Sequence, residues 1–192
     1  MKNRKTSKTI LSVYEWLETF LLALTVVVLV FTFAVKFVTV DGPSMEHTLS
    51  SGDRLLISNA FYKAERGDIV VVDVHDAVKT RPEFFRSAPA APYIKRVIAV
   101  EGDVIDVDPE TWTVSVNNEP VDEPYVYFRE GEEMHTDPLN KITFPYTVSK
   151  DCVFVMGDNR NNSTDSRILG EIHEKDILGK VVLRLFNFGG EN

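Results

Sequence analysis

The sequence is poor in cysteine. Cys152 is the one cysteine among 192 residues, so no disulfide can form within the chain. A domain of this size can hold its core without disulfides, so the cysteine count leaves the cellular compartment open. Cys152 lies in the alternating apolar stretch CVFVM (152–156), which favours a buried structural thiol over a nucleophile.

Metal-binding motifs are missing as well. The four histidines, at 47, 75, 135 and 173, are scattered, and the sequence has neither HExxH nor a paired CxxC, which argues against zinc. The stretch DNRNNSTDSRILGE (158–171) is as polar as a calcium-binding EF-hand loop but lacks the glycine at the sixth position. We therefore expect an activity that uses no metal and no other cofactor.

Most of the chain carries more negative than positive charge. Five of the 21 Lys and Arg residues and two of the 29 Asp and Glu residues lie in the first 36 positions, so the remainder carries a net charge of −11. Nucleic acid requires a basic surface, and this balance argues against it as a partner.

The sequence has one long hydrophobic run, TFLLALTVVVLVFTFAV, from Thr19 to Val35. Its 17 residues span about 26 Å as a helix, and Lys36 can reach back to the interface, so the run just crosses a bilayer core of about 30 Å. The alternative is a cleavable signal peptide, whose apolar region is usually about 7–15 residues and ends in an A-x-A site. Ala34-Val35-Lys36 is a poor cleavage site, so an uncleaved signal-anchor is favoured.

Basic residues precede this run and predict its orientation. Lys2, Arg4, Lys5 and Lys8 would stay in the cytoplasm by the positive-inside rule. We expect a cytoplasmic tail at 1–15, a transmembrane helix at 16–38 and an extracytoplasmic domain at 39–192.

Short runs rich in β-branched residues follow the anchor. They are RLLIS (54–58), DIVVVDV (68–74), YIKRVIAV (93–100), DVIDV (103–107), TVSV (113–116), CVFVM (152–156) and KVVLRLF (180–186). Asn117-Asn118 is typical of a hairpin tip, residues 75–92 and 118–150 are expected to be loops or insertions, and 163–177 can hold a short helix. The predicted fold is mainly β, an antiparallel sheet or barrel tethered by one amino-terminal helix.

The stretch VDGPSMEHTL (40–49) follows the apolar run directly. Asp41-Gly42-Pro43 favours a turn that presents Ser44 beside Met45, which we expect to be exposed. The segment matches only the first half of the G-x-S-x-G nucleophile elbow, and its β-rich surroundings differ from an α/β hydrolase. A Ser-His-Asp hydrolase is therefore disfavoured.

A serine can instead be activated by a lysine, provided that burial lowers the lysine pKa enough to make the amine neutral. Lys95 lies within YIKRVIAV and shares a strand face with Tyr93, Val97 and Ala99. Arg96 is equally central on the opposite face, so periodicity does not choose between the two. Only the lysine can lose its proton at workable pH. The alternative is that both side chains reach solvent or pair with acids such as Asp165.

Three segments together resemble bacterial type I signal peptidases, in the order of that family. They are GPSMEHTL (42–49), YIKRVIAVEGD (93–103) and VMGDNRNNSTDSR (155–167), and RGDIVVV (66–72) and GKVVLRLF (179–186) also fit. The resemblance covers much of residues 36–170. In its short length and single anchor, the chain is similar to the Gram-positive type of this family. The resemblance implies a membrane-bound serine endopeptidase that removes signal peptides from secreted preproteins after small residues at −1 and −3.

The resemblance also implies roles for individual residues. Ser44 matches the nucleophile, Lys95 the general base, and Ser163 the serine that orients the lysine. Asp165 and Arg167 match an acid–base pair that holds the loop shaped by residues 157–160.

Two positions depart from the family pattern. Many relatives carry a hydroxyl two residues before the nucleophile that helps to bind the oxyanion, whereas this chain has Gly42. Relatives commonly have proline at the position of His47, and we interpret this histidine as incidental to catalysis.

Substrate contacts and partners follow from the same resemblance. The matching positions are Val38, Val40, Met45, Leu49, Tyr93 and Ile94, and they predict an apolar, shallow pocket whose rim meets lipid. The implied partners are secretory preproteins and the lipid bilayer, with the secretion translocon as a further candidate.

Other functions remain open at this point. The chain could be a specialised peptidase that processes only a few precursors. A self-cleaving repressor is remote, because an apolar helix occupies the place of a DNA-binding region. A non-enzymatic alternative is an anchored β domain that binds peptides or partners through its loops.

Overall fold

The structure is a computed structural model that describes residues 3–60, 62–74, 91–108, 110–127 and 142–185. The chain divides into two compact units, Met1–Lys36 and Phe37–Asn192, which are described separately below.

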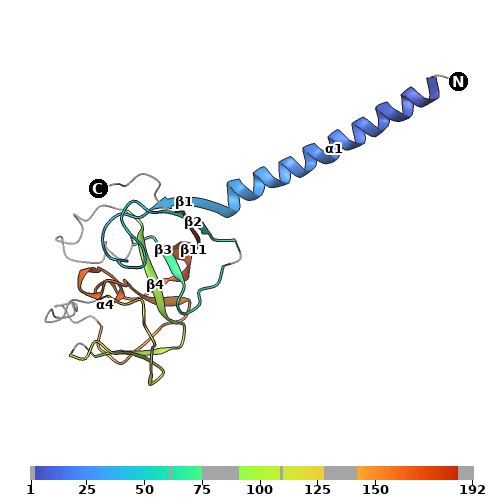
Figure 1. Ribbon diagram of the computed structural model, residues 1–192. Coiled ribbons are helices and arrows are strands. Elements are labelled where there is room, and N and C mark those ends of the chain that lie inside the picture. Colours follow the sequence, from blue (N-terminus) through green and yellow to red (C-terminus); the bar gives the residue numbers. More distant parts are fainter. Residues whose placement is uncertain (1–2, 61, 75–90, 109, 128–141, 186–192) are drawn as a thin grey trace. The chain divides into compact units, whose positions relative to one another are not determined.

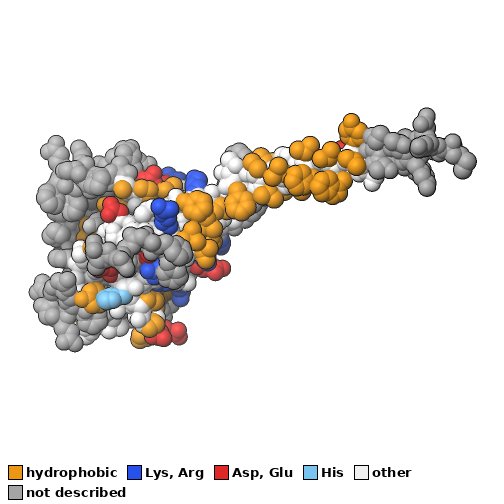
Figure 2. Space-filling model, turned by 45° about the horizontal axis from the view of Figure 1, so that its top comes forward, with side chains coloured by type: hydrophobic (Ala, Val, Ile, Leu, Met, Phe, Trp, Pro, Cys, Tyr) orange, Lys and Arg blue, Asp and Glu red, His pale blue; other side chains and the backbone are white. Residues whose placement is uncertain are grey.

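The first unit is built on helix α1, Asn3–Ala34. Its window Ser12–Leu29 has a mean hydropathy of 1.6 and no buried residue, and hydrophobic side chains dominate the helix surface in Figure 2. The helix is long and apolar enough to cross a membrane. It ends at Ala34, whereas the sequence pattern placed its end at 38. Residues Val35–Thr39 form strand β1 instead, beside β2, because this segment is rich in β-branched residues and has a neighbouring strand to pair with.

A seven-stranded sheet is the main element of the second unit, and Figure 1 shows β3, β4 and β11 side by side within it. The strand order is β1-β2-β11-β3-β4-β9-β10. Beyond β1, the strands are β2 Arg54–Ser58, β3 Ile69–Val72, β4 Tyr93–Val100, β9 Cys152–Met156, β10 Ile172–His173 and β11 Ile177–Leu185. The pairs from β2 through β10 are antiparallel.

A smaller antiparallel sheet has the order β7-β6-β5-β8. Its strands are β5 Val104–Val107, β6 Val114–Val116, β7 Glu119–Pro120 and β8 Tyr146–Thr147. Asn117 and Asn118 join β6 to β7 with φ values of 56° and 65°, which are typical of the two-residue turn that the sequence predicted there.

The predicted loops at 75–92 and 118–150 are only partly described. Strands β7 and β8 show that the second of these segments contributes to a sheet, because its ends pair with β6 and β5. Residues 75–90 and 128–141 lie outside the described residues.

Within the described residues of the second unit, the helical elements are short: η1 Arg160–Asn162, α4 Ser166–Leu169 and η2 Glu174–Asp176. The last two fall within the 163–177 segment for which a short helix was predicted. The mainly β, antiparallel fold class is confirmed.

One core cluster joins the two sheets. Phe154 and Met156 of β9 are 0% exposed and belong to the same cluster as Ile105 and Val116 of the small sheet. Phe144 and Tyr146 lie with ring centroids 6.0 and 6.1 Å from Phe154.

Another cluster lies beneath the Ser44 segment and includes Met45, Leu49, Leu55 and Ile94. Met45 is only 1% exposed, so the prediction of an exposed methionine is wrong. The turn folds back on itself, with the Leu49 N–H donating to the Met45 carbonyl at 2.8 Å, and this directs the Met45 side chain into the core.

Replacing Phe154 with alanine should lower the free energy of unfolding by about 3–5 kcal/mol, because the substitution leaves a cavity between the two sheets. The matched control is Phe37→Ala, since Phe37 is 70% exposed and its loss should change stability by less than about 0.5 kcal/mol. Guanidinium denaturation of the detergent-solubilised chain, followed by near-ultraviolet circular dichroism, measures both. Equal effects of the two variants would contradict this account of the core.

Candidate active site

Ser44 lies on a turn that hydrogen bonds hold against the loop after β9. The Glu46 N–H donates to the Pro43 carbonyl at 3.1 Å, which closes the turn. The Asn159 N–H donates to the Ser44 carbonyl at 3.0 Å, and Asn159 Nδ2 donates to the Pro43 carbonyl at 3.1 Å. These bonds fix the backbone on both sides of the serine hydroxyl.

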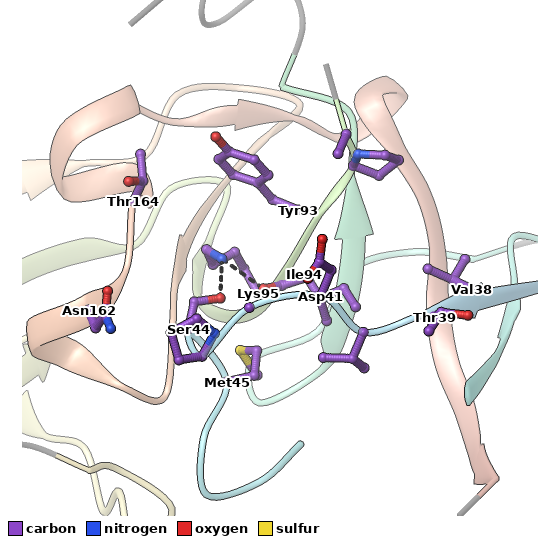
Figure 3. Close-up of a pocket in the computed structure, with 15 residues that line it drawn as sticks. Val38, Thr39, Asp41, Ser44, Met45, Tyr93, Ile94, Lys95, Asn162 and Thr164 are labelled. Atoms are coloured by element: carbon purple, nitrogen blue, oxygen red, sulfur yellow. Dashed lines mark hydrogen bonds between the residues drawn. The ribbon is translucent and has the colours of Figure 1, made fainter. Parts of the chain in front are cut away.

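Lys95 lies near the start of β4, opposite Val70 of β3, and is only 4% exposed. Figure 3 shows its side chain directed at Ser44. Nζ donates to Ser44 Oγ at 2.8 Å and to the Ile94 carbonyl at 2.9 Å, and it lies 5.1 Å from the centroid of the Tyr93 ring. The structure therefore brings together the serine and the lysine that the sequence singled out.

Burial changes the acidity of this lysine. Loss of hydration lowers the pKa of Lys95 from 10.5 to about 8; the Asp165 charge opposes this shift and the Arg167 charge supports it. About one amine in ten is then neutral at pH 7. In that form the nitrogen lone pair can accept the Ser44 hydroxyl proton across the 2.8 Å contact.

Arg96 points to the opposite face of β4 and is paired. Its Nε and NH2 groups donate to the two carboxylate oxygens of Asp158 at 2.9 and 2.6 Å, and its guanidinium lies 3.8 Å from the Tyr125 ring centroid. The sequence left open whether either cation of this strand pairs with an acid. Arg96 does, and the acid is Asp158 rather than Asp165.

Asp165 and Arg167 form a fully buried ion pair. Arg167 Nε and NH2 each donate to one carboxylate oxygen of Asp165 at 2.8 Å, and the Gly157 N–H donates to the same carboxylate at 2.9 Å. Burial opposes ionisation of Asp165, but Arg167 and these hydrogen bonds outweigh it and lower the pKa of the carboxyl. The pair thus ties the 163–167 segment to the end of β9.

Ser163 is buried beside Gly157. A Cβ atom on Gly157 would lie 2.3 Å from Ser163 Oγ and 2.5 Å from the Ser44 carbonyl oxygen, so only glycine fits between these two serines. No hydrogen bond joins Ser163 Oγ to Lys95, whose amine donates to Ser44 and Ile94 instead. The role of Ser163 in orienting the lysine stays a prediction.

A cavity of about 330 Å³ adjoins Ser44 and Lys95. Five of the six positions predicted to contact substrate line it, namely Val38, Val40, Met45, Tyr93 and Ile94. Leu49 does not line it; its side chain packs in the cluster beneath the turn. The cavity wall formed by these five residues is largely apolar, and Figure 3 shows Asn162 and Thr164 on the opposite side.

Asn162 and Thr164 were missed by the sequence reasoning, together with Thr39, Asp41, Pro43, Ala91 and Pro92, which also line the cavity. A signal for the first two was present, since they flank Ser163. The backbone at Ser163 is extended, with φ −139° and ψ 125°, so alternate side chains share a face. Nothing in the sequence pattern pointed to Ala91 and Pro92, which precede β4.

Gly42 lines the cavity at a φ of 90°, a conformation that favours glycine, and it has no hydroxyl to offer an oxyanion. The Ser44 N–H donates to no atom of the residues that the structure describes, so it is available as one oxyanion donor. His47 makes no hydrogen bond with Ser44 in that part of the chain; its ring packs against Tyr127, with centroids 4.3 Å apart.

Removing the Asp165 carboxylate should be strongly destabilising, because it leaves the Arg167 charge buried and unpaired. We expect Asp165→Ala to lower the free energy of unfolding by about 3–5 kcal/mol. The control is Lys180→Ala, which breaks the partly exposed Lys180–Asp68 pair and should cost less, about 1 kcal/mol. Denaturant titration of both variants measures the difference, and a small effect of Asp165→Ala would show that the pair does not hold the loop.

Comparisons with known proteins identify the family of this chain. The model of the family "Signal peptidase, peptidase S26" matches residues 13–186. Signal peptidase I P of Bacillus subtilis subsp. natto is 36% identical over 182 residues, which cover 91% of this chain and 90% of the relative. Signal peptidase IB of Staphylococcus aureus strain COL is 31% identical over 188 residues, covering 92% of this chain and 91% of the relative.

A crystal structure of a signal peptidase I from Enterococcus faecalis aligns with a TM-score of 0.47 and 22% identity, covering 63% of this chain and 98% of the other. The family model and the two relatives extend over nearly the whole sequence, including the Ser44 turn, β4 and the 157–167 loop. This chain belongs to the signal peptidase family, peptidase S26.

Proposed function

We propose that this chain is a membrane-bound serine endopeptidase that removes amino-terminal signal peptides from secreted preproteins. The observation that carries the proposal is the 2.8 Å contact between the buried Lys95 amine and the Ser44 hydroxyl, at the edge of a small apolar cavity. Membership of the signal peptidase family and relatives named signal peptidase I support it.

Acylation begins when Ser44 Oγ attacks the carbonyl carbon of the scissile bond. As the new C–O bond forms, the hydroxyl proton passes to the neutral Lys95 Nζ. The tetrahedral intermediate then collapses, the C–N bond breaks, and Nζ returns the proton to the leaving amine. The signal peptide is left as an ester on Ser44.

Deacylation repeats these steps with water as the nucleophile. Lys95 Nζ, neutral again after the amine has left, takes a proton from the attacking water and later returns it to Ser44 Oγ. The same base serves both halves because Nζ is held at hydrogen-bonding distance from Oγ. The Ser44 N–H supplies one oxyanion donor, and the chain has no hydroxyl at Gly42 for a second.

The cavity favours substrates with small residues at −1 and −3. Its volume of about 330 Å³ is shared among several substrate positions, and Val38, Val40, Met45 and Ile94 supply apolar walls. An extended peptide places alternate side chains on one face, so the residues at −1 and −3 point the same way into these walls. Large side chains there would meet core residues that cannot move without a packing cost.

The proposed topology has three parts: a cytoplasmic tail at 1–15, a membrane anchor at 16–38 and an extracytoplasmic catalytic domain at 39–192. Support comes from the apolar window Ser12–Leu29 and from the basic residues that precede it. The partners would be secretory preproteins in the bilayer, delivered by the secretion translocon, and the acidic domain disfavours nucleic acid.

Substitutions in the dyad test the mechanism directly. Ser44→Ala and Lys95→Met should each lower kcat/KM for a preprotein with alanine at −1 and −3 by about 10²–10⁴-fold or more, because nucleophile or base is lost. Lys95→Arg should fail to restore activity, since a guanidinium keeps its proton. The control is Lys63→Met at an exposed lysine, which should cleave normally. Full activity of either dyad variant would refute the proposal.

The pH dependence follows from the lowered pKa of Lys95. The active form is the neutral amine, so kcat/KM should rise with pH and level off above the pKa of about 8. At pH 7 it should be roughly a tenth of the plateau, and at pH 6 roughly a hundredth. Initial rates at low substrate concentration between pH 6 and 9.5 measure the profile, and a flat profile would exclude a lysine base.

A further inference from the structure

A second hollow lies close to the dyad and has no role in the chemistry above. It measures about 390 Å³ and is lined by His47, Thr48, Pro124, Tyr125, Val126 and Tyr127. We call it the Tyr127 groove. One wall is formed by His47 and Thr48, just after the Ser44 turn, and the other by the segment 124–127, which is far away in sequence.

The cavity and the groove are lined by successive parts of the segment that carries Ser44. Residues 38–45 line the cavity, and His47 and Thr48 line the groove. Asn159, which bonds to the Ser44 carbonyl, forms a β-bridge with Tyr127, so the far wall lies about two strand spacings, roughly 10 Å, from the nucleophile.

Backbone hydrogen bonds hold the 124–127 segment against the loop that follows β9. The Tyr127 N–H donates to the Asp158 carbonyl at 2.8 Å, and the Arg160 N–H donates to the Tyr127 carbonyl at 3.0 Å. Arg160, which is 0% exposed, binds both carboxylate oxygens of Glu123 at the start of the segment.

Side chains fix the walls as well. The Arg96 guanidinium stacks on Tyr125, and the Thr48 hydroxyl donates to Asp158. His47 itself is exposed, and its ring makes a T-shaped contact with the ring of Tyr127. The groove is thus a preformed aromatic surface. The loop after β9 holds both this surface and the Ser44 turn in place.

We propose that the Tyr127 groove binds the part of the substrate that follows the scissile bond, the first residues of the mature chain. This inference rests on the proposed function. A preprotein does not end at the cleaved bond, so its chain must continue past Ser44 on the side away from the signal-peptide cavity. The groove is a hollow within reach of that chain, because its far wall lies about two strand spacings from the nucleophile.

The lining predicts which residues the groove prefers. The aromatic rings of Tyr125 and Tyr127, the ring of His47 and the pyrrolidine of Pro124 offer flat apolar surface with polar edges. An aromatic or large aliphatic side chain within the first three mature residues should therefore bind better than alanine. Specificity for the mature residues would come from one stacking contact, whereas specificity at −1 and −3 comes from the small size of the side chains.

The test compares two kinds of substrate that share every residue up to −1. The long peptides continue for several residues past the scissile bond, with either phenylalanine or alanine placed in turn at +1, +2 and +3. The short peptide ends at −1 in a methyl ester, whose leaving group is too small to reach the groove. The variants are His47→Ala and Tyr127→Ala. The matched control is His173→Ala, an exposed histidine outside the groove.

We expect wild-type kcat/KM to be higher for phenylalanine than for alanine at one of the three positions. Both groove variants should lower this preference, and the long-to-short ratio of kcat/KM, by about threefold to tenfold, mainly through KM. His173→Ala should keep the wild-type ratio. Because His47 is exposed, its variant keeps the test valid even where Tyr127→Ala disturbs the fold.

Three outcomes would overturn the inference. A proportionate loss on long and short peptides would show that the groove variants act on the dyad and not on substrate. An unchanged long-to-short ratio of kcat/KM in both groove variants, with Ser44-dependent cleavage intact, would overturn the proposed role of the groove alone. Absence of cleavage of both substrates by the wild-type chain would overturn the proposed function, and the groove with it.

Discussion

The burial of one amine is the constraint on which the rest of the site depends. A lysine becomes a base near neutral pH only where the protein withholds water from it, and β4 achieves this by lying between β3 and β9 in the seven-stranded sheet. Lys95 is enclosed by the strand and by the Ser44 turn packed over it, so the hydrogen bond to Ser44 Oγ replaces hydration. Chemistry and packing therefore use the same residues: Met45 and Ile94 are core and cavity wall at once.

Three buried arginine pairs hold the segments around this amine. Arg96 pairs with Asp158, Arg167 with Asp165, and Arg160 with Glu123. Buried ion pairs contribute little net stability, because desolvation offsets much of their attraction, but an unpaired member is costly. Such pairs therefore penalise alternative arrangements of the loop after β9. That loop positions Asn159 against the Ser44 carbonyl and, through Tyr127, also fixes the groove beyond the dyad.

Much of this fold could be predicted from the sequence, because local preference and burial agree over most of the chain. Strands β2, β4 and β9 have the predicted bounds, since each is a run of β-branched and apolar residues. The Asn117-Asn118 turn follows from the tolerance of asparagine for positive φ. The resemblance to type I signal peptidases brought Ser44, Lys95 and the Asp165–Arg167 pair into view before any geometry was known.

By itself, the sequence determined the elements, the apolar helix and a short set of candidate residues. Tertiary structure decided the rest. Alternation could not choose between Lys95 and Arg96, because both faces of a central strand are covered; only the partners differ, a serine hydroxyl on one face and Asp158 on the other. Met45 lies inside because the turn folds back over apolar residues distant in sequence. These outcomes depend on contacts between remote segments, which a local pattern does not encode.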